Sequence, residues 1–142
     1  MTLRNQVKMS FLSCSENVGI ARITAAAFAA QFDLPLSTIE EIKVAISEAV
    51  SNAIIHGYAA AQGTVEMIMN QYNGRLEFDV IDYGCGIADI NEARQPAFSH
   101  SPGRMGLGFT FMESFMDELI VESSVGEGTK VHMVKNITVS TH

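Results

Sequence analysis

The sequence has little positive charge, no tryptophan and only two cysteines. Lys and Arg number 9 against 16 Asp and Glu, which gives a formal net charge of -7 at pH 7. Nucleic-acid-binding domains and polybasic membrane-binding segments concentrate positive charge, so this balance argues against both functions. It does not argue against ATP, because a metal ion and a few local donors neutralise the phosphates.

Several other features are missing as well. Cys14 and Cys85 show no CxxC spacing, and we interpret them as free thiols; the four histidines form no zinc motif. No apolar run approaches the ~20 residues that span a bilayer, and the N-terminus has no secretory hydrophobic region. We therefore expect a cytoplasmic protein. The length of 142 residues predicts a single domain over residues 1–142.

Apolar residues alternate in three stretches, which is the period of strands. Residues 6–12 form one strand pattern, residues 64–82 form two runs around Asn73-Gly74, and residues 119–137 form a second hairpin around Gly126-Glu127-Gly128. Helical patterns fill the intervals. The resulting order predicts an α+β protein with two layers: a mixed or antiparallel sheet with helices on one face.

Four helices are expected between these strands. The first begins near Ser15 and has an apolar stripe of Ile20, Ile23, Ala27 and Phe28. The second runs from Ser37, in a capping box with Glu40, to Gly57. A short acidic helix over residues 89–94 and a helix over residues 109–118 complete the set.

The second helix carries two polar residues beside its apolar face. Glu48 and Asn52 are one turn apart, close enough to serve one site, and His56 continues their row. The alternative is a partly solvated helix edge with a weak hydrogen bond between the two side chains. Position alone assigns no role to His56.

Two glycine-rich stretches follow. Asp82 ends a strand and is followed by Gly84 and Gly86, an arrangement that lets the backbone pass close to a ligand while Asp82 accepts a hydrogen bond from an exocyclic amine. An ordinary surface turn is the alternative. Further on, Gly106 and Gly108 open a helix whose free N–H groups suit phosphate, although no Walker motif follows.

Taken in order, these elements resemble the GHKL ATPase and kinase superfamily, which includes gyrase, the histidine kinases and MutL. Its N box matches Glu48 and Asn52, its first glycine box matches Asp82, Gly84 and Gly86, and its second matches Gly106 and Gly108. The stretches "SEAVSNAIIHGY", "EARQPAF" and "MGLGFTFMESFMDELIVES" further resemble the anti-sigma-F factors of spore-forming bacteria, and this likeness covers nearly the whole chain. The resemblance implies a Bergerat-type fold that binds ATP and Mg²⁺ beneath a lid.

It also implies a set of roles for the nucleotide site. Asn52 would hold Mg²⁺, and Glu48 would orient or deprotonate the attacking serine hydroxyl. Asp82, supported by Thr129, would bind the adenine amine. Gly84 and Gly86 would let the backbone approach the nucleotide, while the N–H groups after Gly106 and Gly108 would cradle the phosphates.

The family's partners follow from the same likeness. It implies a homodimer that holds a sporulation sigma factor inactive and phosphorylates a serine of an anti-anti-sigma protein. Arg104 would contact phosphate or a partner, and Arg22 would contact a partner, although a solvated helix arginine explains Arg22 equally well. The lid, "AFSHSPGRMGLGF", is shorter than the usual form and has Ser99-His100-Ser101 where a lysine is common.

Three alternatives stay open on the sequence. One is a nucleotide-gated sigma-binding module with little kinase activity, which a short lid permits. Another is the related anti-sigma kinase of the general stress response. The catalytic domain of a histidine kinase ranks last, because no helix with a phospho-accepting histidine precedes the first strand.

Overall fold

A computed structural model describes residues 2–58, 62–87 and 105–137 of the chain. Five strands and the helices between them follow one another in the order that the sequence predicts. The elements are β1 (Asn5–Leu12), α1 (Asn17–Ala29), the 3₁₀ turn η1 (Ala30–Phe32), α2 (Leu36–Asn52), the π-helical turn η2 (Ala53–Gly57), β2 (Thr64–Tyr72), β3 (Arg75–Asp82), α4 (Met105–Phe115), β4 (Glu118–Ser124) and β5 (Gly128–Asn136).

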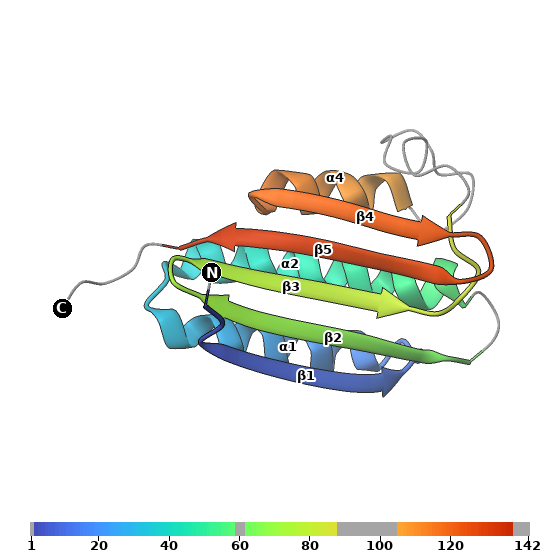
Figure 1. Cartoon of the computed structure of the whole chain (residues 1–142), viewed down its shortest axis with the longest axis horizontal. Helices are drawn as coiled ribbons and strands as arrows, with labels where there is room; N and C mark the ends of the chain where they lie inside the picture. Colours follow the sequence, from blue (N-terminus) through green and yellow to red (C-terminus); the bar gives the residue numbers. More distant parts are fainter. Residues whose placement is uncertain (1, 59–61, 88–104, 138–142) are drawn as a thin grey trace.

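The strands form one sheet in the order β1-β2-β3-β5-β4, and all neighbours are antiparallel (Figure 1). Both predicted hairpins are confirmed. Their turns contain Gly74 with φ of 77° and Gly126 with φ of 84°, a left-handed conformation that favours glycine. The register pairs Asp82 with Thr129, so the end of β3 lies beside the start of β5.

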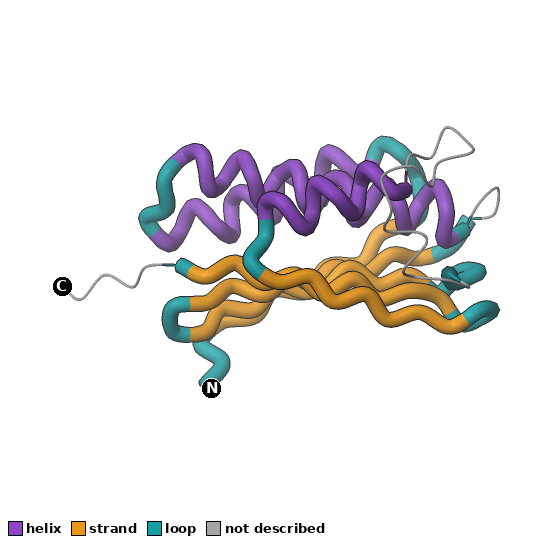
Figure 2. Tube along the Cα trace, turned by 90° about the horizontal axis from the view of Figure 1, so that it is seen from above, coloured by secondary structure: helices purple, strands orange, loops and turns teal. Residues whose placement is uncertain are grey.

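The helices α1, α2 and α4 cover one face of this sheet, which gives the predicted two layers (Figure 2). The core lies between the layers. Alternate residues of β2 and β3 are buried in it, including Met67, Phe78 and Val80, and they meet the apolar face of α2. That face consists of the residues that helical period predicts: Ile42, Ile46, Ala49, Val50 and Ala53.

Of the apolar stripe predicted for the first helix, only Phe28 is buried. Ile20 is 54% exposed and Ile23 is 67% exposed, whereas Ala21, Ala25, Phe28 and Ala29 are buried. Alanines on the buried face let α1 approach α2 closely, and this packing outweighs the larger apolar area of the isoleucines. Hydrophobic type alone therefore misassigned the face.

The capping box at Ser37 is also wrong. The helix begins one residue earlier, at Leu36, and no side chain caps its N-terminus. Pro35 occupies the N-cap position, and its carbonyl oxygen accepts hydrogen bonds from the N–H groups of Thr38 (3.0 Å) and Ile39 (3.2 Å). Proline favours helix starts because its φ is fixed near the helical value.

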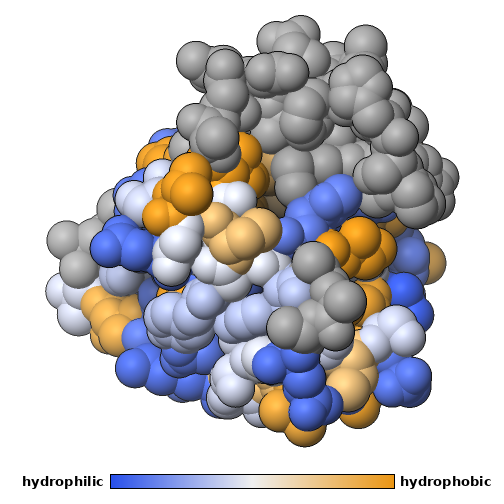
Figure 3. Space-filling model, turned by 90° about the vertical axis from the view of Figure 1, so that its right-hand side faces the viewer, coloured by the Kyte–Doolittle hydropathy of each residue, from blue (hydrophilic) through white to orange (hydrophobic). Residues whose placement is uncertain are grey.

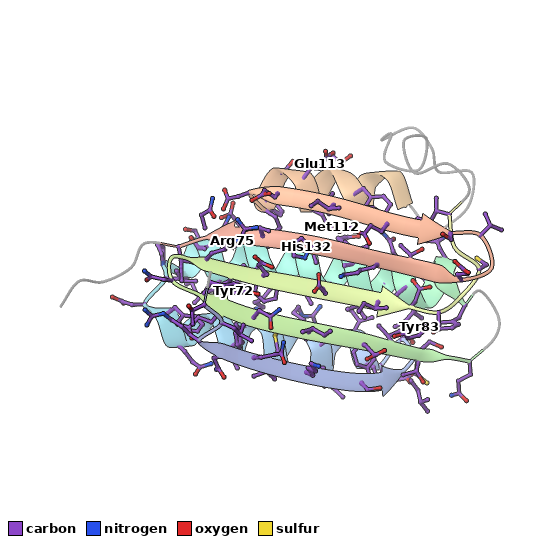
Figure 4. The ribbon with its side chains drawn as sticks, in the orientation of Figure 1. Tyr72, Arg75, Tyr83, Met112, Glu113 and His132 are labelled. Atoms are coloured by element: carbon purple, nitrogen blue, oxygen red, sulfur yellow. The ribbon has the colours of Figure 1, made fainter. Side chains whose placement is uncertain are left out.

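The sheet face opposite the helices carries polar side chains that pair across strands. His132 on β5 lies 2.5 Å from Asp79 on β3, measured from Nδ1 to Oδ1. Within β3, Arg75 Nε donates to Glu77 Oε2 at 2.6 Å, and across strands Arg75 Nη1 lies 3.3 Å from Glu118 Oε2 on β4 (Figure 4). Cross-strand pairs of this kind fix strand register and keep the open face of the sheet soluble.

Within the described part of the chain, no helix is both long and apolar enough to cross a membrane. Both Cys14 and Cys85 are free thiols, as expected. The predicted acidic helix over residues 89–94 and most of the lid, including Arg104, fall outside the described residues.

Candidate nucleotide-binding site

A pocket opens where the C-terminal end of α2 meets the end of β3 and the start of β5. Figure 3 faces this end of the molecule, where hydrophilic and hydrophobic residues lie side by side. Apolar side chains form most of the walls, and a few polar groups converge on the space, which is typical of small-molecule sites. The lining residues are Ala49, Asn52, Ala53, His56, Gly57, Val80, Asp82, Gly86, Ile87, Phe109, Thr129 and Val131.

Asp82 is the acidic residue in this lining. Its side chain is almost fully buried at the end of β3, and its Oδ1 atom accepts a hydrogen bond from the N–H of Gly84 at 3.0 Å. Burial raises the pKa of Asp82 above its ordinary value, and hydrogen bonds from the Gly84 and Thr129 backbones oppose that rise. The carboxyl group is therefore positioned by the backbone and partly desolvated, as a ligand-binding acid requires.

The backbone around Asp82 is packed so tightly that glycine is needed at two positions. A Cβ on Gly84 would lie 1.7 Å from the carbonyl oxygen of Gly57, and a Cβ on Gly57 would lie 2.7 Å from Asp82 Oδ1. The N–H of Cys85 donates to that same Gly57 carbonyl at 2.7 Å. The end of η2 therefore presses directly against the loop that follows Asp82 and fixes the direction of the carboxyl group.

The same loop is held from the other side by the β4–β5 hairpin. Gly86 has a φ of 75°, and a Cβ there would lie 2.2 Å from the carbonyl oxygen of Ser124. The Ser123 hydroxyl accepts from the N–H of Ile87 at 2.7 Å and lies 2.8 Å from the Thr129 hydroxyl. Gly86 and Thr129 line the pocket, whereas Gly84 packs against Gly57.

Glu48 and Asn52 meet α4 beside this pocket. A Cβ on Gly108 would lie 3.1 Å from Glu48 Oε2 and 3.1 Å from Asn52 Nδ2. Asn52 is only 7% exposed, and its Nδ2 atom has no hydrogen-bond partner in the part of the chain that the structure describes. The predicted acid–amide pair and the predicted glycine-rich helix start therefore come together. Gly106 belongs to the first turn of α4.

The other sequence-predicted residues lie elsewhere. Arg22 is on α1, where its guanidinium donates to Ser47 Oγ at 3.4 Å, and it does not line the pocket. Tyr83, between Asp82 and Gly84, points away from the pocket; its hydroxyl donates to Glu66 on β2 (Figure 4). That hydrogen bond raises the pKa of Tyr83.

Sequence reasoning missed two residues that shape the site. Gly57 reads as a helix C-cap, yet its lack of a Cβ also makes room for the Asp82 carboxylate. Ser123 lies opposite Thr129 in the β4–β5 register, and the hydroxyls of both residues are linked. The available signal for Ser123 was its place in the strand before the Gly-Glu-Gly turn.

Among the described residues, no cluster of three or more His, Cys, Asp or Glu side chains could hold a metal ion. The site therefore offers no all-protein metal cage. Magnesium in phosphoryl-transfer sites is usually bound by one or two protein oxygens together with substrate phosphates and waters. The oxygens of Glu48 and Asn52, brought together beside α4, fit that pattern.

Comparison with known proteins agrees with this geometry. Residues 12–135 match a family described as a histidine kinase-like ATPase domain. In solved structures, the histidine kinase domain of the blue-light activated histidine kinase of Erythrobacter litoralis EL346 matches with a TM-score of 0.59 at 21% identity, over 87% of this chain and 60% of that one. A longer chain of the same kinase matches with a TM-score of 0.57 at 25% identity, over 74% of this chain and 32% of that one. The fold and the pocket thus define an ATPase domain of the histidine kinase-like class.

Curated relatives identify the family within this class. The anti-sigma F factor of Geobacillus kaustophilus is 48% identical over 141 residues, which cover 97% of each chain. That of Clostridium acetobutylicum is 45% identical over 135 residues, which cover 94% of each chain. The chain belongs to the anti-sigma F factor family.

Proposed function

We propose that this protein is an ATP-dependent serine kinase that also acts as an anti-sigma factor for a sporulation sigma factor of the sigma-F type. The observation that carries the proposal is the meeting of three sequence-distant groups at one pocket. Asp82, Asn52 and Thr129 line the pocket, and Glu48 meets Asn52 at the Gly108 position beside it. One domain would contain both functions.

The adenine base would bind at Asp82. Its carboxyl group accepts from the N–H groups of Gly84 and Thr129, and a carboxylate has further lone pairs that would accept from the exocyclic amine of adenine. The apolar walls formed by Val80, Phe109 and Val131 suit a flat ring. Thr129 supports Asp82 through its backbone N–H and is itself held by Ser123.

The triphosphate would extend toward α4. Gly106 and Gly108 lie in the first turns of that helix, where free N–H groups and the helix dipole favour negative charge. The amide oxygen of Asn52 would be the protein's ligand to Mg²⁺, which when bound neutralises charge on the phosphates and orients them. Arg104, which precedes α4 in the sequence, would add a contact to phosphate or to a partner.

Glu48 would act on the substrate serine. Its carboxylate lies beside the Gly108 position, one helical turn from Asn52, and so would face the terminal phosphate. There it would orient the serine hydroxyl and accept its proton as the serine oxygen bonds to the γ-phosphorus and ADP leaves. Phosphoryl transfer depends mainly on positioning and charge neutralisation, so orientation would be its larger contribution.

The partners are proposed from the relatives and from one exposed surface. The relatives are called anti-sigma F factors, which makes a sigma factor the first expected partner and an anti-anti-sigma protein the expected substrate. Arg22 lies on α1 between Ile20 and Ile23, both of them exposed apolar side chains. Ile20 and Ile23 are one turn apart and form an exposed apolar strip on α1, and arginine is enriched in protein interfaces. We propose Arg22 as a partner contact of this helix in a homodimeric protein.

Two other functions remain as alternatives to this proposal. A sigma-binding module gated by nucleotide would use the same pocket without efficient transfer. The related anti-sigma kinase of the general stress response would use the same chemistry on a different sigma factor. The first is distinguished by the assay below, and the second by comparing the two kinds of sigma factor in a binding experiment.

The test is phosphorylation of an anti-anti-sigma protein with labelled ATP and Mg²⁺. The wild type should transfer label to serine, and Glu48→Ala and Asn52→Ala should each lose transfer. Glu40→Ala is the matched control: Glu40 lies on the same helix, is largely exposed and forms only a surface ion pair with Lys43. This control should keep full activity. A wild type that binds ATP without transferring label would leave only the binding module.

A further inference from the structure

His56 lines the proposed nucleotide pocket and has a buried nitrogen without a hydrogen-bond partner among the described residues. This nitrogen is Nε2 of the imidazole ring. Buried polar atoms in native proteins nearly always have a partner, and one without a partner destabilises the folded state. Because this residue lines the pocket, a ligand bound there is a natural source of the missing partner.

The position of His56 shows which part of a ligand it would meet. Glu48, Asn52 and His56 follow one another at intervals of four residues, about 6 Å per step along an α-helix. At one end of this row, Glu48 and Asn52 contact the Gly108 position. At the other end, Gly57 follows His56, and a Cβ on Gly57 would lie 2.7 Å from Asp82 Oδ1. His56 thus lies between the proposed phosphate end and the proposed base end.

The local backbone supports this placement. The α-helix ends at Asn52, and residues Ala53–Gly57 continue as a single π-helical turn. Such turns are rare and are frequent at functional sites, because they redirect a side chain from the direction that a continuous α-helix gives it. Here the turn carries His56 and ends at the glycine that contacts Asp82.

We propose that His56 Nε2 hydrogen-bonds an oxygen in the middle of the nucleotide, on the ribose or the α-phosphate. The inference rests on the proposed ATP-binding function and adds a ligand-contacting residue to it. ATP and ADP share these oxygens, so His56 contributes equally to the affinity for both. Bound nucleotide would then supply a partner to an atom that has none among the described residues.

The first test compares His56→Leu and His56→Gln with the wild type by calorimetric titration and thermal unfolding. His56→Leu removes the unpaired nitrogen, so the nucleotide-free protein should melt at the same temperature as the wild type or higher. Its affinity for ATP and for ADP should fall by the same factor, about tenfold. His56→Gln keeps a polar atom near the Nε2 position and should retain most of the affinity.

Nucleotide fragments identify the oxygen. If the ribose is contacted, adenosine binding should weaken in His56→Leu as well, and if the α-phosphate is contacted only AMP, ADP and ATP should weaken. Unchanged affinity for ATP and ADP would overturn the proposal. The proposal would also be overturned if nucleotide-free His56→Leu lost binding and melted at a lower temperature than the wild type, because that pattern shows a structural role.

A second measurement needs no folded variant. The ¹⁵N resonance of the His56 Nε2 atom in the wild type should shift when ADP is added, whereas that of His132, already held by Asp79 at 2.5 Å on the opposite sheet face, should not. A His56 resonance that stays unchanged at saturating ADP would overturn the proposal. A wild type that binds neither ATP nor ADP would instead contradict the proposed function.

Discussion

Replacing Asp82 by asparagine exchanges one carboxylate oxygen for an NH₂ group with almost no change in shape. The N–H of Gly84 donates to Asp82 Oδ1 at 3.0 Å, and an asparagine would keep this bond with its only side-chain oxygen. Its NH₂ group would then face the pocket in place of the second carboxylate oxygen. A donor would therefore meet the exocyclic amine of adenine, which is also a donor.

The size of the effect on ATP binding follows from this exchange. A net hydrogen bond to a charged group contributes about 1.5–3 kcal/mol, and leaving the opposing donor unpaired adds to the loss. Asp82→Asn should therefore weaken ATP binding by about tenfold to a hundredfold. GTP presents a carbonyl oxygen where ATP presents the amine, so the variant should lose much of the preference for ATP over GTP.

The same substitution should have a pH-dependent effect on stability. Burial raises the folded-state pKa of Asp82, so the folded protein holds this proton more tightly than the unfolded chain. The stability that follows is present below the unfolded pKa and is lost as the pH rises through the raised folded pKa. Asparagine does not titrate. The unfolding free energy of Asp82→Asn should therefore increase relative to the wild type across that window and stay constant above it.

Chemical denaturation of both proteins without nucleotide, from pH 3.5 to 8, measures the stability difference, and calorimetric titration at pH 7.5 measures ATP and GTP affinity. A constant difference in unfolding free energy over the whole range would show that Asp82 is not desolvated as the structure has it. Undiminished ATP binding by the variant would show that the base lies elsewhere.

Three further substitutions test separate parts of the structure. Gly108→Ala should raise stability by up to about 1 kcal/mol through helix propensity and lower phosphoryl transfer by about tenfold, because its Cβ would press on Glu48 and Asn52; faster transfer would contradict the geometry. Gly84→Ala should lower the free energy of unfolding in urea by more than about 3 kcal/mol, because its Cβ would lie 1.7 Å from a carbonyl oxygen. Gly126→Ala has open space around its Cβ and should lower it by only about 1–2 kcal/mol. Equal losses in the two variants would refute the close approach at Gly84. Arg22→Ala should weaken sigma-factor binding in a pull-down titration and leave ATP affinity unchanged, and equal loss of both would place Arg22 in the fold rather than in an interface.

Hydrophobic periodicity and turn residues were enough to predict the hairpins and the second helix. The alternation of Val65, Met67 and Met69 survives in the structure because one sheet face is buried and the other is open. The stripe of α2 is likewise buried as predicted, because the sheet lies on one side of it only. These elements obey the simple relation between hydrophobic period and burial.

The first helix shows why that relation fails elsewhere. Its buried face, Ala21, Ala25 and Phe28, depends on how closely α1 and α2 approach, and that distance is a tertiary property. Ile20 and Ile23 are exposed instead, which is what we expect of a helix whose outer face has a partner. No local pattern distinguishes an apolar core face from an apolar binding face.

The candidate site also has parts that the sequence predicts and parts that only the structure shows. Residue type and spacing indicated Glu48, Asn52, Asp82 and the glycines, since each motif carries its own chemistry. The contact between Gly57 and the Asp82 carboxyl group could not be predicted, because it joins residues 25 positions apart through a fold not yet known. His56 is a similar case: the role proposed for it depends on a buried nitrogen without a partner among the described residues, which only the packed structure shows.

The most direct measurement is a crystal structure of the protein with Mg²⁺ and a non-hydrolysable ATP analogue. The account predicts the adenine amine within hydrogen-bonding distance of Asp82, the metal ion on the amide oxygen of Asn52, and the γ-phosphate between Gly108 and Glu48. A nucleotide bound outside this pocket, or inside it with the base toward α4 and the phosphates toward Asp82, would contradict it.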